Sequence, residues 1–341
     1  MIHRKTSSSE DSEDLTHGGA LDAMRRAFPE IEEPWLDLST GINPFPYPWL
    51  APSDASTQHL PTRELETTCR EAMANALGTD ADKLLLAPGS ELLIRLLPTV
   101  LSLRRVAVLA PSYGDHRSVW LAAGGELIED PDPLRFVNDV DALVLCNPNN
   151  PDGRSFDPDV LCKARNTLSS RGGFLIVDEA YADLRPSLSL ARQGGSEGLI
   201  ILRSFGKFFG LAGLRLGAML GPDSVLSAMR DRLGAWPVSG IALELGARAY
   251  ADSAWQESTR RALAKARARL DGILHDAGLA QAAGTDLFAY VRTDDAERCW
   301  KKLAQRGIYV RRFPWSQEHL RIGLPANEDA ELRLRKALLC D

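Results

Sequence analysis

The residue types around Lys207 suit nucleophilic chemistry beside a phosphate group. Lys207 ends the stretch Ser204-Phe205-Gly206-Lys207, which begins two residues after the apolar run from Leu199 to Leu202, and Arg215 comes eight residues later. A turn after a buried strand holds a lysine partly out of water, which favours its neutral, nucleophilic amine. The hydroxyl of Ser204 and the guanidinium of Arg215 are groups that bind phosphate well. The pattern predicts a reactive lysine at a phosphate site, and the plain alternative is a surface lysine in a βα loop.

Four further polar segments follow apolar, strand-like runs in the same way. They are Gly89-Ser90-Glu91, Pro111-Ser112-Tyr113-Gly114, Asn147 to Gly153 with Asn150 inside it, and Asp178-Glu179-Ala180-Tyr181. In a parallel sheet, ligands bind beyond the carboxyl ends of the strands, so these segments are expected to meet. A helix start at Ser90 can bind phosphate through its backbone amides, and Tyr113 can stack on an aromatic ring. Each also has a structural alternative: a helix cap for Ser90 and Asp178, a turn for Asn150, and packing for Tyr113.

Helices and short apolar strands must alternate to bring these segments to one sheet edge, and the chain shows that alternation from Glu64 onward. The predicted strands span 83–87, 105–110, 142–145, 174–177, 199–202 and 216–220, and the predicted helices include 63–77 and 91–101. Several of the strands are continuously apolar, as strands covered on both faces must be. The pattern predicts an α/β fold whose large domain has a mostly parallel central sheet sandwiched by helices.

A smaller α/β domain is predicted toward the C-terminus, after a long helical region at 239–278. Its strands are expected near 287–291, 309–313 and 319–324, and its helices near 296–306 and 328–339. Ahead of the large domain, a short helix at 21–28, a strand at 35–38 and a proline-rich loop at 45–61 are expected. The predicted division is an N-terminal arm with its short helix and strand at 1–44, a large domain at 45–235, and a linking helix with the small domain at 236–341.

Composition excludes several classes of protein. The net charge is −6 over 341 residues, which gives no basic footprint for nucleic acid. The five cysteines include no C-x-x-C pair and the six histidines no H-E-x-x-H, so no metal site is expected. No apolar run is long enough to span a bilayer, and the first fourteen residues are polar and charged without an apolar signal core. We expect a cytoplasmic protein with a disordered N-terminal extension.

From residue 17 to about 339 the sequence resembles fold-type-I pyridoxal-phosphate (PLP) enzymes of the class I/II aminotransferase group. The motifs around Lys207, Asp178 and Asn150 carry this resemblance. It implies PLP as cofactor, bound covalently by Lys207, with Asp178 at the ring nitrogen and Tyr181 and Asn150 at the phenolate oxygen. The implied cofactor-binding residues are Gly89, Ser90, Glu91, Tyr113, Asn150, Asp178, Tyr181, Ser204, Lys207 and Arg215, of which Lys207, Asp178 and Tyr181 are catalytic.

Within this group the N-terminal segments His17-Gly18-Gly19 and Gly41-Ile42-Asn43-Pro44 resemble those of threonine-phosphate decarboxylases, and histidinol-phosphate aminotransferases are next in similarity. The resemblance implies PLP-dependent decarboxylation of L-threonine O-phosphate to (R)-1-amino-2-propanol phosphate in cobalamin biosynthesis. The alternative is an aminotransferase acting on histidinol phosphate or a similar phosphorylated amine. The implied substrate-binding residues are His17, Gly18, Gly19, Asn43, Arg311 and Arg321.

The resemblance also implies a homodimer with active sites at the interface, and the apolar, proline-rich segment 44–52 suits such an interface. In one departure from the family pattern, Leu60 stands where most relatives have a tyrosine that reaches the partner's cofactor phosphate. Two other classes are excluded. Penicillin-binding enzymes share S-x-x-K but need further motifs that this chain lacks, and a P-loop needs Gly and Ser/Thr where Ile201 and Phe208 stand.

Overall fold

The computed structural model describes residues 18–32, 34–49 and 51–339. The chain forms two compact units, which we call the large unit (Pro46–Ser258) and the small unit (Met1–Phe45 with Thr259–Asp341). The division falls inside helix α11 (Ser253–Asp276), whereas the sequence-based boundary lay near 235. Among the described residues, no helix is both long and apolar enough to cross a membrane.

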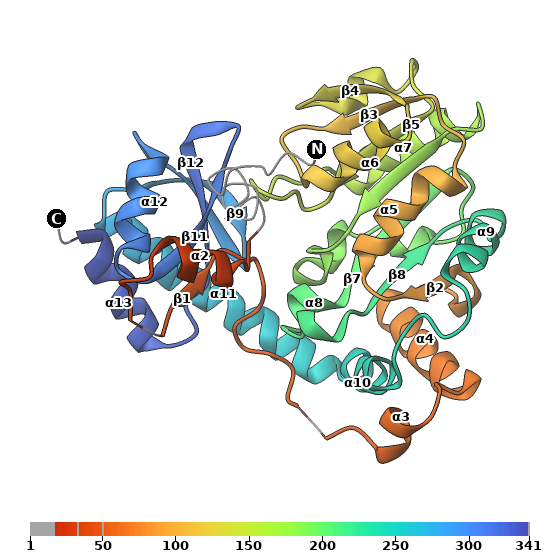
Figure 1. Ribbon diagram of the computed structural model, residues 1–341. Helices are drawn as coiled ribbons and strands as arrows, with labels where there is room; N and C mark the ends of the chain where they lie inside the picture. The colour runs from red at the N-terminus through yellow and green to blue at the C-terminus, as the bar shows by residue number, and fades with distance from the viewer. Residues whose placement is uncertain (1–17, 33, 50, 340–341) are drawn as a thin grey trace, which may run out of the picture. The chain divides into compact units, whose positions relative to one another are not determined.

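The large unit is built on a seven-stranded sheet. The strand order is β2 (Leu84–Ala87), β8 (Gly217–Leu220), β7 (Leu199–Ser204), β6 (Phe174–Asp178), β5 (Ala142–Cys146), β3 (Arg105–Leu109) and β4 (Glu126–Asp130). Strands β3, β5, β7 and β8 can be followed in Figure 1. The five strands from β7 to β4 pair in parallel, while β8 runs antiparallel to both of its neighbours. The predicted α/β fold with a mostly parallel sheet is confirmed.

Helices cover this sheet, and the central strands are buried along their whole length. The helices of the large unit are α3 (Asp54–Gln58), α4 (Arg63–Leu77), α5 (Ser90–Val100), α6 (Gly114–Ala122), α7 (Pro158–Ser169), α8 (Phe205–Phe208), α9 (Asp223–Leu233) and α10 (Gly240–Ala251). Short 3-10 turns lie at 81–83, 133–136, 182–184, 186–188, 191–193 and 212–214. Helix α4 shows why the predicted bounds hold: Thr62 Oγ1 accepts from Leu65 N at its start, and Gly78, with φ 71°, ends it.

Three parts of the large unit differ from the sequence-based expectation. The loop expected at 45–61 contains α3, because the Ser53 side chain caps a single helical turn. Strand β4 was not expected, since three of its five residues, Glu126, Glu129 and Asp130, are charged, and it pairs with β3 at the sheet edge. The long helical region breaks into α10 and α11, because Asp252 ends the first helix and its Oδ1 accepts from Trp255 N in the second.

The small unit has a five-stranded sheet in the order β1 (Leu36–Leu38), β11 (Ile308–Phe313), β12 (Ser316–Gly323), β10 (Phe288–Arg292) and β9 (Ala280–Thr285). Strand β1 pairs in parallel with β11, and the other strands pair antiparallel. The accompanying helices are α2 (Leu21–Ala27), α12 (Ala296–Ala304), α13 (Glu328–Leu339) and most of α11. The N-terminal strand therefore belongs to the same sheet as the C-terminal part of the chain.

Candidate functional site

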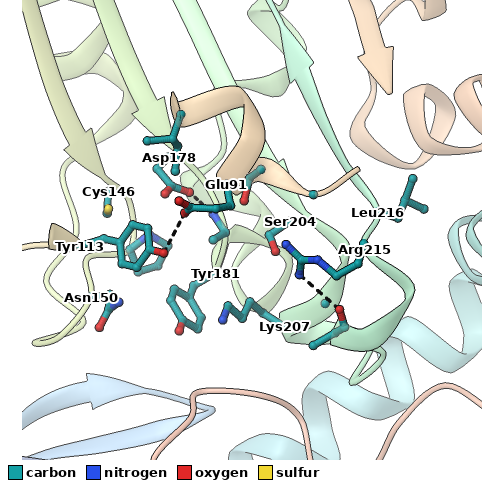
Figure 2. A pocket seen from close by; sticks show the side chains of 17 residues that line it. Glu91, Tyr113, Cys146, Asn150, Asp178, Tyr181, Ser204, Lys207, Arg215 and Leu216 are labelled. Atoms are coloured by element: carbon teal, nitrogen blue, oxygen red, sulfur yellow. Dashed lines mark hydrogen bonds between the residues drawn. The ribbon is translucent and has the colours of Figure 1, made fainter. Parts of the chain in front are cut away.

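A pocket of about 200 Å³ lies in the large unit, beyond the carboxyl ends of β5, β6 and β7. Figure 2 shows Tyr113, Tyr181 and Lys207 directed to this pocket from three different segments. All ten residues predicted to bind the cofactor line it: Gly89, Ser90, Glu91, Tyr113, Asn150, Asp178, Tyr181, Ser204, Lys207 and Arg215. The structure thus brings residues of all the strand-end segments together at one edge of the sheet.

Asp178 lies at the last position of β6 and is held by a histidine that the sequence analysis missed. Its Oδ2 is 3.0 Å from Nε2 of His116, and its Oδ1 accepts from Ala180 N at 3.0 Å. Burial disfavours a charged imidazole, but Cys146 and Asp178 outweigh that effect and raise the pKa of His116 to about 10. A protonated His116 donates a charged hydrogen bond to Asp178. The only local signal was the position of His116, three residues after Tyr113 on the next helix.

One end of the pocket suits a phosphate group. Gly89, with φ 88°, occupies the N-cap position of α5, and no side chain caps the amides of Ser90 and the next residues. Arg215 adopts a left-handed conformation with φ 53°, and its Nη2 would lie 2.8 Å from a Cβ placed on Gly89. Glycine is therefore needed for the guanidinium to approach the start of α5. Uncapped amides, this guanidinium and the nearby Ser204 hydroxyl form a donor set typical of phosphate binding.

Lys207 reaches the pocket from α8, a single helical turn that follows β7. Gly206 lets this turn pack closely, since a Cβ there would lie 2.7 Å from Ala212 Cα. Beneath α8, Phe205 and Phe209 stack at 4.5 Å between ring centroids, and Phe209 also stacks on Trp255 at 5.7 Å. This aromatic cluster is buried, so it anchors the turn and leaves the half-buried amine directed to the pocket.

A buried ion cluster ties the strand ends behind the pocket together. Arg203, just before Ser204 on β7, donates to Glu179 Oε2 at 2.8 Å and also pairs with Asp183. Burial opposes the charge of Arg203, but Asp183 and Glu179 raise the pKa of its guanidinium above the ordinary value. Glu179 directly follows Asp178. The cluster therefore positions the two segments that carry Asp178 and Lys207, and no local pattern in the sequence indicated it.

Most of the predicted substrate-binding residues lie in the small unit. Gly18 and Gly19 pack on Ser39: Gly19 N donates to Ser39 Oγ at 2.8 Å, and a Cβ on Gly18 would lie 2.5 Å from Ser39 O. Nη2 of the buried Arg321 donates to the same Ser39 carbonyl at 2.7 Å. His17 lies outside the described residues.

Arg311 and Arg321 are direct cross-strand partners on β11 and β12. Directly opposite residues point to the same face of a sheet, where two like charges destabilise the pair unless an anion or another partner compensates. Asn43, by contrast, uses its Oδ1 to accept from Phe45 N at 2.8 Å and closes a turn. The described N-terminal glycines and the two arginines thus belong to the same unit, which the sequence spacing alone did not indicate.

The family to which the chain belongs follows from comparison with known proteins. The model of the aminotransferase class I and II family matches residues 33–335, so the chain is a member of that family. A threonine-phosphate decarboxylase of Pseudomonas aeruginosa is 39% identical over 95% of this chain and 97% of its own length. Another, from a Sinorhizobium species, is 37% identical over the same shares. The predicted family resemblance is confirmed.

Solved structures confirm the fold. The histidinol-phosphate aminotransferase of Sinorhizobium meliloti, solved in complex with pyridoxal 5'-phosphate, matches with a TM-score of 0.83 at 21% identity, over 99% of this chain and 97% of that one. The class I and II family uses PLP. The uncapped start of α5 and the guanidinium packed against Gly89 suit the phosphate of this cofactor, and the Asp178 carboxyl group suits its ring nitrogen, so the residues present fit it.

Proposed function

We propose that this protein is a PLP-dependent decarboxylase that converts L-threonine O-phosphate to (R)-1-amino-2-propanol phosphate, a step of cobalamin biosynthesis. The observation that carries the proposal is the identity of 39% and 37% to two threonine-phosphate decarboxylases over nearly the whole chain. Histidinol-phosphate aminotransferases among the curated relatives are 25–30% identical. Lys207 and Asp178 at one pocket of the large unit support PLP chemistry.

Different residues of the pocket bind different parts of the cofactor and the substrate. When bound, PLP supplies an electron sink that weakens the bonds at the substrate Cα. Lys207 would hold the cofactor covalently, and its amine would carry the proton that replaces the lost carboxylate at Cα. Asp178, positioned by its contact with His116, would hold the proton on the ring nitrogen. Tyr181 and Asn150 donate hydrogen bonds to the phenolate oxygen, while Gly89, Ser90, Glu91, Ser204 and Arg215 surround the phosphate.

The substrate carries two anionic groups, a carboxylate and a phosphate, and the small unit offers donors of matching charge. Arg311 and Arg321 bind one group each, because two guanidinium groups facing from adjacent strands favour two anions or a single dianion. The backbone of Gly18 and Gly19, with His17 before them, binds the substrate phosphate. Decarboxylation rather than transamination then depends on which Cα bond these groups hold perpendicular to the cofactor ring.

We infer that the active protein is a homodimer. The large unit exposes Trp49 by 59%, Leu60 by 65% and Trp236 by 59%, and large apolar side chains of this kind mark contact surfaces. Leu60 has no hydrogen-bonding group in its side chain, so anchoring of the cofactor phosphate depends on Ser90, Ser204 and Arg215 within one chain.

The decisive assay compares two reactions of the purified protein with PLP. We expect release of CO2 and aminopropanol phosphate from L-threonine O-phosphate, and little glutamate from histidinol phosphate with 2-oxoglutarate. Glutamate formation without CO2 release would overturn the decarboxylase in favour of the aminotransferase. The variant His17→Ala is expected to raise KM for L-threonine O-phosphate and spare kcat, because it removes binding made equally in ground and transition states. Retention of PLP by that variant controls for a folding defect.

A further inference from the structure

The hydroxyl of Tyr113, at the wall of the pocket, lies between two carboxyl groups. Its oxygen is 2.8 Å from Oε2 of Glu91 and 3.0 Å from Oδ2 of Asp115. A phenol has one hydrogen to donate, and an ionised carboxylate can only accept. With both carboxylates ionised, the hydroxyl would therefore satisfy one of them fully and leave two negative charges facing a single oxygen.

One cation faces these two carboxyl groups. Arg95 Nε lies 2.6 Å from Glu91 Oε1, and its Nη2 lies 3.2 Å from Asp115 Oδ2. The Asp115 side chain is 12% exposed and that of Glu91 29%, so water screens the pair only in part. Burial, followed by the neighbouring Asp115, raises the pKa of Glu91.

Other charged groups on and around α5 and α6 have partners of their own. They are His116 with Asp178, Arg117 with Glu129 on β4, and Arg232 of α9 with the Thr99 carbonyl near the opposite end of α5. Lys207 and Arg215 line the same cavity as Glu91, and the Arg215 guanidinium lies beside Gly89 at the start of α5. The charged groups in contact around the Tyr113 hydroxyl are thus two carboxyl groups and one guanidinium. One additional proton on a carboxyl group would make this cluster neutral.

We propose that Glu91 and Asp115 share one proton at neutral pH and that this proton is held on Glu91. The pair positions Tyr113 at the cofactor pocket, and the carboxyl group of Glu91 is uncharged. In this arrangement the Glu91 carboxyl donates to the Tyr113 oxygen, and Tyr113 donates to ionised Asp115, which pairs with Arg95. Every donor then has an acceptor. Glu91 and Asp115 are positioning residues, because they act through Tyr113.

The uncharged state matters because of where Glu91 lies. It is the second residue of α5, beside the start of that helix. The proposed function, on which this inference rests, assigns the cofactor phosphate to this helix start. An ionised carboxylate there would repel a phosphate dianion at short range in a partly desolvated pocket. A protonated Glu91 allows the helix start to bind the anion and still supplies the hydrogen bond that holds Tyr113.

The test measures binding of pyridoxamine 5'-phosphate, which has no aldehyde to react with Lys207, to the cofactor-free protein by tryptophan fluorescence. Glu91→Gln mimics the protonated acid and is expected to raise Kd much less than Asp115→Asn does. Asp115→Asn leaves Glu91 as the lone carboxylate of the cluster, which then ionises, so Kd is expected to rise about tenfold. Glu71→Gln, at an exposed position of α4, is the matched control and should bind as the wild type does.

A role in packing alone predicts equal effects of the two isosteric amides, so equal Kd values for Glu91→Gln and Asp115→Asn would overturn the inference. The shared proton is also tested without cofactor. Native Glu91 keeps its proton above the ordinary pKa of 4.5, so it contributes stability that is lost as pH rises through its raised pKa. The free energy of unfolding of the wild type should therefore fall over that window relative to Glu91→Gln.

Parallel stability curves for wild type and Glu91→Gln would overturn the shared proton. Failure of the wild type to bind pyridoxamine 5'-phosphate would instead overturn the proposed cofactor site and the role of Glu91 toward its phosphate. The two failures are distinguishable, because the stability comparison uses the cofactor-free protein.

Discussion

Replacing Glu179 by glutamine should strongly destabilise the large unit, although the residue does not line the pocket. Its side chain is 0% exposed, and its partner Arg203 is 1% exposed. Glutamine has the shape of glutamate, so the variant removes a charge without opening a cavity. Arg203 would then keep only Asp183 as a counter-charge, inside a core where an unpaired guanidinium is costly.

The magnitude follows from the contacts of the carboxylate. Glu179 accepts from Arg203 Nη1 at 2.8 Å, Ser189 Oγ at 2.5 Å and Leu190 N at 2.7 Å. A glutamine side chain has one acceptor oxygen, so its NH2 group must face one of these donors. A hydrogen bond to a charged group contributes about 1.5–3 kcal/mol, and breaking a buried ion pair costs about 3–5 kcal/mol. Since Asp183 remains, we expect the lower value, about 3 kcal/mol.

Thermal unfolding of the cofactor-free protein measures this loss without a contribution from ligand binding. For a unit of roughly 200 residues, 1 kcal/mol corresponds to about 2–4 °C in Tm, so Glu179→Gln should lower Tm by about 6–12 °C. The exposed Glu71→Gln should stay within about 0.5 kcal/mol of the wild type. A triple replacement of Glu179 and Asp183 by Leu and of Arg203 by Met should recover much of the loss. A fall of less than about 2 °C for Glu179→Gln would refute the reasoning.

Three further outcomes are expected. Borohydride reduction of the PLP-loaded protein should fix the cofactor on the peptide that contains Lys207, and a label on any other lysine would contradict the assignment. The raised pKa of His116 predicts that wild-type stability declines between pH 6.5 and about 10, because the native state binds a proton there that the unfolded state has lost; His116→Asn should lack this decline. Sedimentation at micromolar concentration should show a dimer that Trp236→Ser weakens, and a wild-type protein that sediments only as monomer would refute it.

The site was predictable to the extent that its residues follow buried strands. Lys207, Asp178 and Tyr113 each come directly after a run of apolar residues, and the parallel sheet that those runs predict brings their ends to one edge. His116 and Arg203 were not predictable by this route. His116 occupies an ordinary helical position, and Arg203 lies inside a strand, so only contacts between distant segments reveal their partners.

Helices and strands were likewise predictable where neighbouring residues determine them, and not where contacts with distant segments do. The bounds of α4 were predictable because Thr62 and Gly78 are local start and stop signals. The polar strand β4 was not, because its pairing with β3 rather than its own composition makes it a strand. The single turn of α3 depends on one cap from Ser53 within a proline-rich segment that otherwise indicates a loop.

The pairing of β1 with β11 has a consequence for synthesis of the chain. Leu36 of β1 pairs with Ile308 of β11. Strand β1 is synthesised early, so it can pair only after β11 has been synthesised near the end of translation. The large unit is a single continuous stretch and can complete its sheet while the ribosome is still adding the remainder. The N-terminal segment with Gly18 and Gly19 is therefore translated early but packs late. A nascent chain truncated before β11 would contain the pocket of the large unit without the complete sheet of the small unit.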